Sequence, residues 1–543
     1  MTIGCWLNGR HGCHVEKVTF TLFFVGRQRS RMNSMSREEK NARVENPKQE
    51  CLSSGYLLAA VALVALVVCC LAINNQSFWC DETFTGLMAE RPTLAELWRA
   101  VSHHNSDVQI PLYYLFAWAW EKLVGLNEFA MRAGNVLWFL PGVITIFCAL
   151  AGKPLLRSSF SAVLLSSPFA WYYLNDARPY AMEIGLSLVV FAGLYRLGLN
   201  QKGSTQERGW VIALCLGSLL LAASSILAML WLGAYLGAAV LSTPKDHRRR
   251  LALDYRVYWG LTLVLLFALG LFYLWTLSIG ARASPGPTDI RNVMFIVYEL
   301  LGFSGLGPGR LAIRNEGSRV FWPWLPWLAI YAVVLLIVLT QGWKQIAAFT
   351  SRRTRIRWVA AFAVVAGFIV AAGAELRWRA LGRHCTSMLV PVLFVLGAGV
   401  AALLSRRKWA GQLVAVAFVG LNLVSDLNLR FSERHAKEDL RTAAAIATAA
   451  AARGERVWWC ADELAGIYYG VPMSRANSTP ASGQVWLVVN PTERLLASLD
   501  PPQLAVLSSR SGTQDRDQRV RTYLEQGHYN LSQVLSSFTV WRR

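Results

Sequence analysis

Long apolar runs without charged residues dominate this 543-residue chain. About 20 apolar residues in a helix cross a hydrocarbon core of about 30 Å, so each run of that length predicts a membrane span. A lipid core offers the backbone no hydrogen-bond partners, and spans of this kind are therefore helices rather than open sheets. The sequence thus predicts an all-α polytopic membrane protein. Its eleven runs lie near residues 54–74, 131–151, 156–174, 179–198, 208–224, 227–242, 256–279, 322–342, 356–374, 384–404 and 409–427.

The basic residues gather in short loops between the apolar runs, such as Lys245–Arg250 and Arg352–Arg357. A formal net charge of +21 would suit a nucleic-acid partner, but basic loop clusters of this kind mark the cytoplasmic ends of membrane spans. The chain also lacks the interleaved aromatic side chains of a platform for single-stranded nucleic acid. We therefore expect no nucleic-acid partner.

One further apolar segment, Ile110–Gly125, is short for a span and rich in Tyr and Trp, as is typical of a helix lying at the membrane interface. If the N-terminus is cytoplasmic and this segment does not cross, every basic loop cluster falls on the cytoplasmic side. This arrangement predicts eleven spans, a second surface helix at Thr93–Val101 and an outward-facing C-terminus. We expect the membrane to be a bacterial inner membrane, with the periplasm outside.

This organisation divides the chain into three predicted parts. Residues 1–53 are polar and basic and predict a disordered cytoplasmic tail, within which Met32 or Met35 could be the biological start. Residues 54–428 form the membrane domain, with an outer catalytic loop at 75–130. Residues 429–543 alternate short β-like and helix-like segments and predict a small soluble α/β domain at the outer face. Its expected strands are Val457–Cys460, Val485–Val489 and Phe538–Trp541, and its expected helices are Lys437–Ala452 and Asp515–Gln526.

Ionisable residues lie just outside the ends of the spans rather than in their middles. On the outer side these are Asp81, Glu82, Asp107, Asp176, Arg178, Arg383 and His384. A substrate with a lipid tail and a polar head would meet such groups at headgroup depth. A carboxylate there can take a proton from an acceptor hydroxyl, and arginines can hold a phosphate by paired hydrogen bonds.

Five ordered stretches resemble the motifs of membrane glycosyltransferases of the GT-C fold. The resemblance is to the branch that holds protein O-mannosyltransferases, aminoarabinose transferases and lipopolysaccharide sugar transferases. It covers roughly residues 54–200 well and 380–400 loosely. The stretches are Phe78-Trp-Cys-Asp-Glu-Thr83, Ser106-Asp-Val-Gln-Ile-Pro-Leu-Tyr-Tyr114, Asn127-Glu-Phe-Ala-Met-Arg132, Ser167-Pro-Phe-Ala-Trp-Tyr-Tyr-Leu-Asn-Asp-Ala-Arg-Pro-Tyr180 and Arg383-His-Cys-Thr-Ser-Met-Leu-Val-Pro391.

The resemblance implies an inverting transfer of a sugar from a polyprenyl-phosphate donor to a hydroxyl of a lipid, glycan or protein acceptor. Asp81 would act as the base or orient the acceptor, with Glu82 beside it, and Arg178 and Arg383 would contact the donor phosphate. The remaining substrate-binding candidates are Asp107, Gln109, Tyr172, Asp176, Tyr180 and His384. Where the family has His-Pro, this chain has Gln109-Ile110, so neither a base role nor a metal-ligand role for that histidine carries over, and no metal is proposed.

The sequence also allows other interpretations. Arg310, Arg314 and Arg319, in the outer segment Gly280–Phe321, would suit a polyprenyl-linked oligosaccharide ligase or polymerase. A flippase or transporter would place ionisable groups at mid-membrane and show an internal repeat, and the sequence has neither. Structural roles are also available: Asp107 could cap the helix at Ile110–Gly125, and Tyr172 and Tyr180 could belong to an interfacial aromatic belt.

Overall fold

The computed structural model describes residues 47–104, 109–199, 205–279, 286–406, 408–475, 483–509 and 514–543. Two compact units divide the chain, Met1–Leu57 and Leu58–Arg543. The architecture below is that of the second unit. Two expectations fall outside the described residues, namely most of the predicted tail (residues 1–46) and Asp107.

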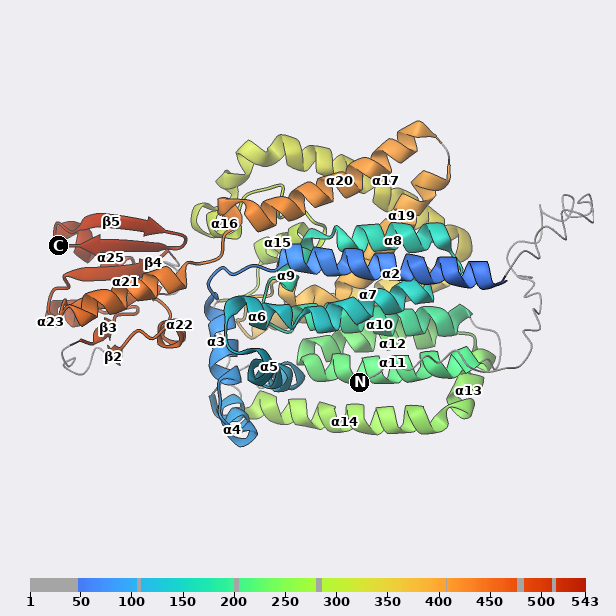
Figure 1. The fold of residues 1–543 in the computed structure, drawn as a ribbon, viewed down its shortest axis with the longest axis horizontal. Helices are drawn as coiled ribbons and strands as arrows, with labels where there is room; N and C mark the ends of the chain where they lie inside the picture. The colour runs from blue at the N-terminus through green and yellow to red at the C-terminus, as the bar shows by residue number, and fades with distance from the viewer. Residues whose placement is uncertain are drawn as a thin grey trace, which may run out of the picture. The chain divides into compact units, whose positions relative to one another are not determined.

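Nine helical segments in the described part of the chain are long and apolar enough to cross a membrane. They agree with nine of the eleven predicted runs (Figure 1). The elements that contain them are α2 (Pro47–Ala72), α6 with α7 (Glu128–Ala133 and Val136–Ala149), α10 (Tyr180–Leu199), α11 (Thr205–Ser224), α14 (Arg256–Ile279), η3 with α17 (Gly317–Trp324 and Leu325–Phe349), α18 (Arg352–Glu375), η4 with α19 (Gly382–Met388 and Leu389–Ser405) and α20 (Trp409–Phe431).

The other two predicted runs form shorter helices. The run at 227–242 is α12 (Ile226–Ser242), 17 residues long, and the chain bends by 120° into α13 (Lys245–Asp254). The run at 156–174 is divided into α8 (Pro154–Leu165) and α9 (Pro168–Leu174). The break falls here because the Ser167 side chain accepts from the backbone N–H of Ala170 and so caps the start of a new helix. Pro168 also has no backbone N–H to continue the hydrogen bonds of α8.

Both predicted surface helices are present as helices, α4 (Leu94–His104) and α5 (Pro111–Val124). Pro111 occupies the first turn of α5, where a missing backbone N–H costs nothing. Gly125 ends the helix with a φ of 81°, a backbone conformation that glycine adopts without strain. The position of α4 and α5 relative to a membrane surface remains a prediction.

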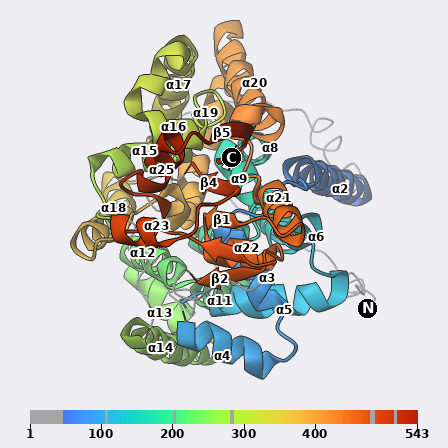
Figure 2. The ribbon, with the colours of Figure 1, turned by 90° about the vertical axis from the view of Figure 1, so that its left-hand side faces the viewer.

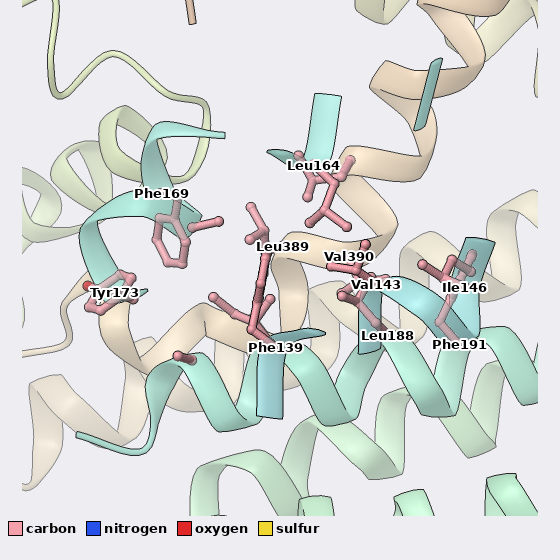
Figure 3. Close-up of a cluster of buried hydrophobic side chains, with 14 of the residues drawn as sticks. Phe139, Val143, Ile146, Leu164, Phe169, Tyr173, Leu188, Phe191, Leu389 and Val390 are labelled. Atoms are coloured by element: carbon pink, nitrogen blue, oxygen red, sulfur yellow. The ribbon is translucent and has the colours of Figure 1, made fainter. Parts of the chain in front are cut away.

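The core of the helical part forms where α7, α10 and α19 meet, with buried aromatic and branched side chains from all three (Figure 3). Phe139 and Val143 come from α7, Leu188 and Phe191 from α10, and Leu389 and Val390 from α19. At Gly142 and Gly185 the backbones of α7 and α10 come too close for a side chain at either position. Small residues at such crossings let helices pack closely where lipid supplies no hydrophobic driving force.

Residues 286–324, which precede α17, are folded rather than extended. They contain α15 (Ile290–Leu300), a glycine-rich loop and α16 (Arg310–Glu316). A Cβ at Gly305 would collide with the Ser425 backbone of α20, and one at Gly309 would collide with the Arg434 backbone, just after α20 in η5 (Glu433–His435). The glycines therefore allow this loop to lie directly against the end of α20 and η5.

The C-terminal residues form the predicted α/β domain around a six-stranded sheet (Figures 1 and 2). The strand order is β2-β3-β1-β4-β6-β5, with β2, β3, β1 and β4 parallel and β6 and β5 antiparallel. Helices α21 and α22 cover one face of the sheet and α23 and α25 the other. The elements are α21 (Leu440–Ala452), β1 (Val457–Cys460), α22 (Glu463–Tyr468), β2 (Met473–Arg475), β3 (Val485–Leu487), α23 (Glu493–Ser498), β4 (Leu504–Ser508), α25 (Arg519–Gln526), β5 (Asn530–Leu535) and β6 (Phe538–Arg542).

Candidate active site

Two adjacent acids, Asp81 and Glu82, stand in the first turn of α3 (Cys80–Ala89). The helix begins after Trp79, whose extended backbone presents its N–H to the Glu82 carboxylate at 3.3 Å. Consecutive residues of a helix do not face the same neighbours. The two carboxylates therefore lie in different surroundings, although they are adjacent in the sequence.

Glu82 is completely buried, and both of its oxygens are engaged. Arg132 donates to Oε1 at 2.8 Å and to Oε2 at 2.7 Å, a two-pronged geometry that gives strong ion pairs. The Ala177 backbone N–H donates to Oε1 at 2.7 Å, and Lys437 Nζ lies 2.8 Å from Oε2. Burial alone would raise the pKa of Glu82, but the charges of Arg132 and Lys437 lower it to about 2. These contacts favour a positioning role for Glu82 over proton transfer.

Arg132, at the end of the short helix α6, also holds the connection between α2 and α3. Its guanidinium donates to the backbone carbonyls of Asn74, Gln76 and Ser77 at 3.1, 2.7 and 3.2 Å. Buried carbonyls of an irregular segment need donors of this kind. Arg132 thus fixes the path of the chain that leads into Asp81 and Glu82.

Asp176 lies in the buried turn between α9 and α10. Its Oδ1 accepts from Trp79 Nε1 at 2.7 Å and lies 3.4 Å from Lys437 Nζ. Burial raises the pKa of Asp176, while the Lys437 ammonium opposes the rise and the Glu82 carboxylate adds to it. Glu82, Arg132, Asp176 and Lys437 together form a cluster of two buried acids and two buried bases, called the charge hub below.

Asp81 lies outside the charge hub and is partly accessible. Its Oδ2 is 2.6 Å from Arg383 Nη1, and the Arg383 and Asp81 side chains are 24% and 29% exposed. The Arg383 guanidinium also lies over the Trp79 ring, 5.5 Å from its centroid. The pair therefore presents a carboxylate and a guanidinium side by side at an accessible position.

Arg178 is buried beside this pair. Its Nη1 donates to the Tyr114 hydroxyl at 3.0 Å and to the Asp81 backbone carbonyl at 3.3 Å. Tyr180, at the start of α10, is buried near Arg383, Arg178 and Asp81. Two guanidiniums, a phenol and a carboxylate thus converge from α3, α10, η4 and the turn before α10.

A row of aromatic rings joins these groups to Arg310. Tyr180 stands edge-on to Tyr173 at 5.0 Å, and Tyr173 to Tyr172 at 5.1 Å. The Arg310 guanidinium lies 3.5 Å from the centroid of the Tyr172 ring and forms an ion pair with the buried Glu299.

Side chains of neighbouring helices anchor η4, which carries Arg383. Trp231 Nε1 donates to the His384 carbonyl at 2.8 Å, and the Tyr235 hydroxyl donates to the Ser387 carbonyl at 2.7 Å. His384 Nδ1 accepts from the backbone N–H of Leu381 at 3.0 Å. The imidazole of His384 therefore caps its own turn, and this contact favours a structural role.

The structure brings Asp81, Arg178, Tyr180 and Arg383 together among the residues singled out from the sequence. It places Glu82 and Asp176 in the charge hub, Tyr172 against Arg310, His384 as a cap, and Gln109 half-buried just before α5. Sequence reasoning missed Arg132 and Lys437 as site residues. Arg132 ends one of the motifs that carried the resemblance, whereas no sequence pattern singled out Lys437.

A small pocket lies beside the charge hub. Tyr172, Asn175, Asp426 and Lys437 are among its lining residues, whereas Asp81 is not. The pocket is therefore separate from the Asp81–Arg383 pair. Among the described residues, no three His, Cys, Asp or Glu side chains are close enough together to hold a metal ion.

No protein-family model matches the chain, and no curated protein sequence matches it either. Solved structures, in contrast, do match the chain. ArnT from Cupriavidus metallidurans in the apo state has a TM-score of 0.50 at 15% identity, covering 90% of this chain and 98% of ArnT. The same protein bound to undecaprenyl phosphate has a TM-score of 0.48 at 14% identity and the same coverage. Arabinofuranosyltransferase AftD from Mycobacteria has a TM-score of 0.41 at 15% identity, covering 74% of this chain and 29% of AftD.

The likeness to ArnT in the apo state concerns the fold. It extends over 90% of this chain and nearly the whole of ArnT. The chain therefore has a GT-C fold, as its sequence motifs predicted. The long apolar helices of its described part make it an integral membrane protein.

Proposed function

We propose that this protein is an inverting membrane glycosyltransferase. It takes a sugar from a polyprenyl-phosphate donor and transfers it to a hydroxyl of a lipid, glycan or protein acceptor, at the periplasmic face of a bacterial inner membrane. The observation that carries the proposal is the partly exposed Asp81 carboxylate, held by Arg383 with Arg178 directly behind it. The GT-C fold supports the proposal as an analogy of architecture.

The proposed reaction uses these groups in one displacement. Asp81 accepts the proton of the acceptor hydroxyl as its oxygen forms a bond to the anomeric carbon of the sugar. The bond from that carbon to the phosphate oxygen breaks, and its electron pair leaves with the phosphate. Arg178 and Arg383 stabilise the negative charge of the departing polyprenyl phosphate. Attack from the face opposite the phosphate inverts the configuration at the anomeric carbon.

The oligosaccharide ligase is a weaker candidate because of the surroundings of Arg310. A ligase of this kind would use arginines of the late outer segment to hold its lipid-linked donor. Arg310 instead pairs with the buried Glu299 and covers Tyr172. Its charge is therefore already balanced within the protein.

The direct test is the turnover of an Asp81→Asn variant in detergent-purified protein, supplied with a panel of labelled polyprenyl-phosphate sugars. Because the amide cannot accept the proton, turnover is expected to fall by about 100-fold or more. Glu90→Gln, which changes an exposed acid at the other end of the same helix, is the matched control and should keep full activity. Wild-type turnover by Asp81→Asn would remove Asp81 from the mechanism.

A second test concerns the arginines. Arg383→Lys keeps a positive charge but loses the two-pronged geometry that suits a phosphate, so donor affinity is expected to fall by about tenfold. Arg314→Lys, in α16, provides a control for the loss of a guanidinium elsewhere. Equilibrium binding of a non-transferable polyprenyl phosphate measures both variants. Unchanged affinity in Arg383→Lys would exclude the phosphate contact.

A further inference from the structure

The segment that connects α20 to the C-terminal domain runs along the chain that leads into α3. The Lys437 backbone N–H donates to Gln76 Oε1 at 3.3 Å. Ser77 donates its hydroxyl to the Glu438 carbonyl and accepts from the Leu440 N–H at 3.1 Å. The connection is therefore fixed to the residues immediately before Asp81.

The Lys437 side chain enters the charge hub from this segment. It is 7% exposed, and its ammonium reaches three oxygens: Glu82 Oε2 at 2.8 Å, the Asn175 carbonyl at 2.5 Å and Asp176 Oδ1 at 3.4 Å. A lysine ammonium has three N–H donors. Burying such a charge is costly unless partners of this kind compensate it. Lys437 is thus held in one direction, toward Glu82.

The sheet of the C-terminal domain sets the position of Lys437. Ser536, in the turn between β5 and β6, donates its hydroxyl to the Lys437 carbonyl at 2.9 Å. The Asp439 N–H donates to the Ser536 carbonyl at 2.9 Å. The lysine backbone is therefore tied to the folded domain on one side and to Gln76 and Ser77 on the other.

The end of α22 makes a second contact, both with α3 and with the segment that leads into α3. The Tyr469 hydroxyl accepts from the Phe78 N–H at 2.7 Å, and the Tyr468 ring lies 5.5 Å from the Phe78 ring. Tyr468 also covers Gly86, where a Cβ would collide with its ring. The C-terminal domain thus contacts the chain both before and after Asp81.

We propose that the C-terminal domain contributes to catalysis, because it fixes Lys437 in the connecting segment, and Lys437 holds Glu82 and thereby positions Asp81. The inference rests on the proposed function, in which Asp81 accepts the proton. Lys437 is a positioning residue: it acts through Glu82, one residue away from the carboxylate that meets the acceptor. Removing the ammonium leaves two acids and one base in the charge hub, and the first turn of α3 loses one of its fixed points.

The test compares Lys437→Met with Arg441→Met. Arg441 lies four residues further along and pairs with Glu128 at 2.6 Å rather than with Glu82, so its variant loosens domain docking without altering the charge hub. In Lys437→Met, kcat is expected to fall by about 100-fold with an unchanged KM for the donor, because a displaced catalytic group costs rate. Arg441→Met is expected to keep kcat within about twofold, since an exposed ion pair contributes little.

A readout that does not depend on activity reports the position of α3 directly. Cys80, next to Asp81, is half-buried and carries a thiol that donates to Asp81 Oδ1 at 3.6 Å. Its rate of modification by a charged thiol reagent, followed by peptide mass spectrometry, is expected to rise about fivefold in Lys437→Met as the first turn loosens. In Arg441→Met the rate should match the wild type.

The pH dependence of kcat distinguishes a positioning role of Lys437 from a role in domain docking alone. The charged groups that act on Glu82 are Arg132 from α6, Lys437 from the connecting segment and Asp176 from the α9–α10 turn, and the phenols of Tyr113, Tyr172 and Tyr468 interact with it. Lys437 lowers the pKa of Glu82, so its removal raises that pKa. Protonation of Glu82 would break its ion pairs in the charge hub and release the first turn of α3. The acid limb of the kcat profile should therefore move to higher pH in Lys437→Met and stay in place in Arg441→Met.

The outcomes are distinct. Equal losses of kcat in the two variants, with no change at Cys80 and no movement of the acid limb, would reduce Lys437 to a docking contact and overturn the inference. If Lys437→Met does not fold, Lys437→Arg, which keeps the charge in a larger side chain, takes its place in the Cys80 measurement. If the wild type transfers no sugar, the proposed function fails, and the Cys80 rates still decide whether Lys437 positions α3.

Discussion

Asp81 and Glu82 are the same kind of group, one residue apart, and they have opposite surroundings. Asp81 is partly exposed and pairs with Arg383, whose side chain is also accessible. Glu82 is buried and fixed by Arg132, Lys437 and the Ala177 backbone. A carboxylate whose oxygens are all engaged inside the protein holds structure, whereas one at an accessible edge can meet a substrate. The surroundings rather than the residue type separate the two roles.

The largest effect that tests this contrast is on stability. Glu82→Gln leaves Arg132 and Lys437 buried without their shared negative partner, and breaking a buried pair typically costs about 3–5 kcal/mol. The free energy of unfolding, measured by reversible denaturation in mixed micelles, should fall by that amount. A change as small as that of a surface acid would show that Glu82 is not the centre of the charge hub.

The pH dependence of the unfolding free energy provides a second test of the Glu82 ion pairs. Because the pKa of Glu82 is lowered from 4.5 to about 2, its contribution to stability is complete above pH 4.5 and is lost as the pH falls toward 2. The difference in unfolding free energy between the wild type and Glu82→Gln should therefore shrink across this window. A difference that stays constant down to about pH 2 would contradict the assigned ion pairs.

An intermediate effect is expected at Gly86, where α3 meets the C-terminal domain. In Gly86→Ala the new methyl group meets the Tyr468 ring, and overpacking of this kind costs about 1–3 kcal/mol. Thermal unfolding would measure the loss. Gly209→Ala in α11, where nothing lies near the added carbon, is the control and should be neutral or slightly stabilising.

The smallest effect is expected for Asp81→Asn, again on stability. Its ion pair with Arg383 is partly solvated, and exposed pairs contribute about 0–1 kcal/mol. The same substitution should nearly abolish turnover. A loss of stability similar to that of Glu82→Gln would erase the contrast between the two acids and make Asp81 a structural residue.

The sequence by itself determined the helical membrane class, nine of the predicted spans and the α/β character of the C-terminal domain. These features follow from local patterns, because apolar length predicts a span and alternation with β-branched and aromatic residues predicts a strand. The ordered motifs also brought Asp81, Arg178 and Arg383 forward as candidates. The division of α8 from α9 could have been read from Ser167-Pro168, a start signal for a new helix inside an apolar run.

Only the tertiary structure decided what surrounds each candidate. Whether Glu82 meets a substrate or a buried guanidinium depends on Arg132, 50 residues away, and on Lys437, 355 residues away. The entry of Lys437 into the charge hub depends in turn on a serine in the β5–β6 turn. No local pattern records such pairings, because they arise from the way distant segments pack. Asp81 and Glu82 are equivalent in the sequence, and burial and long-range charge make them different.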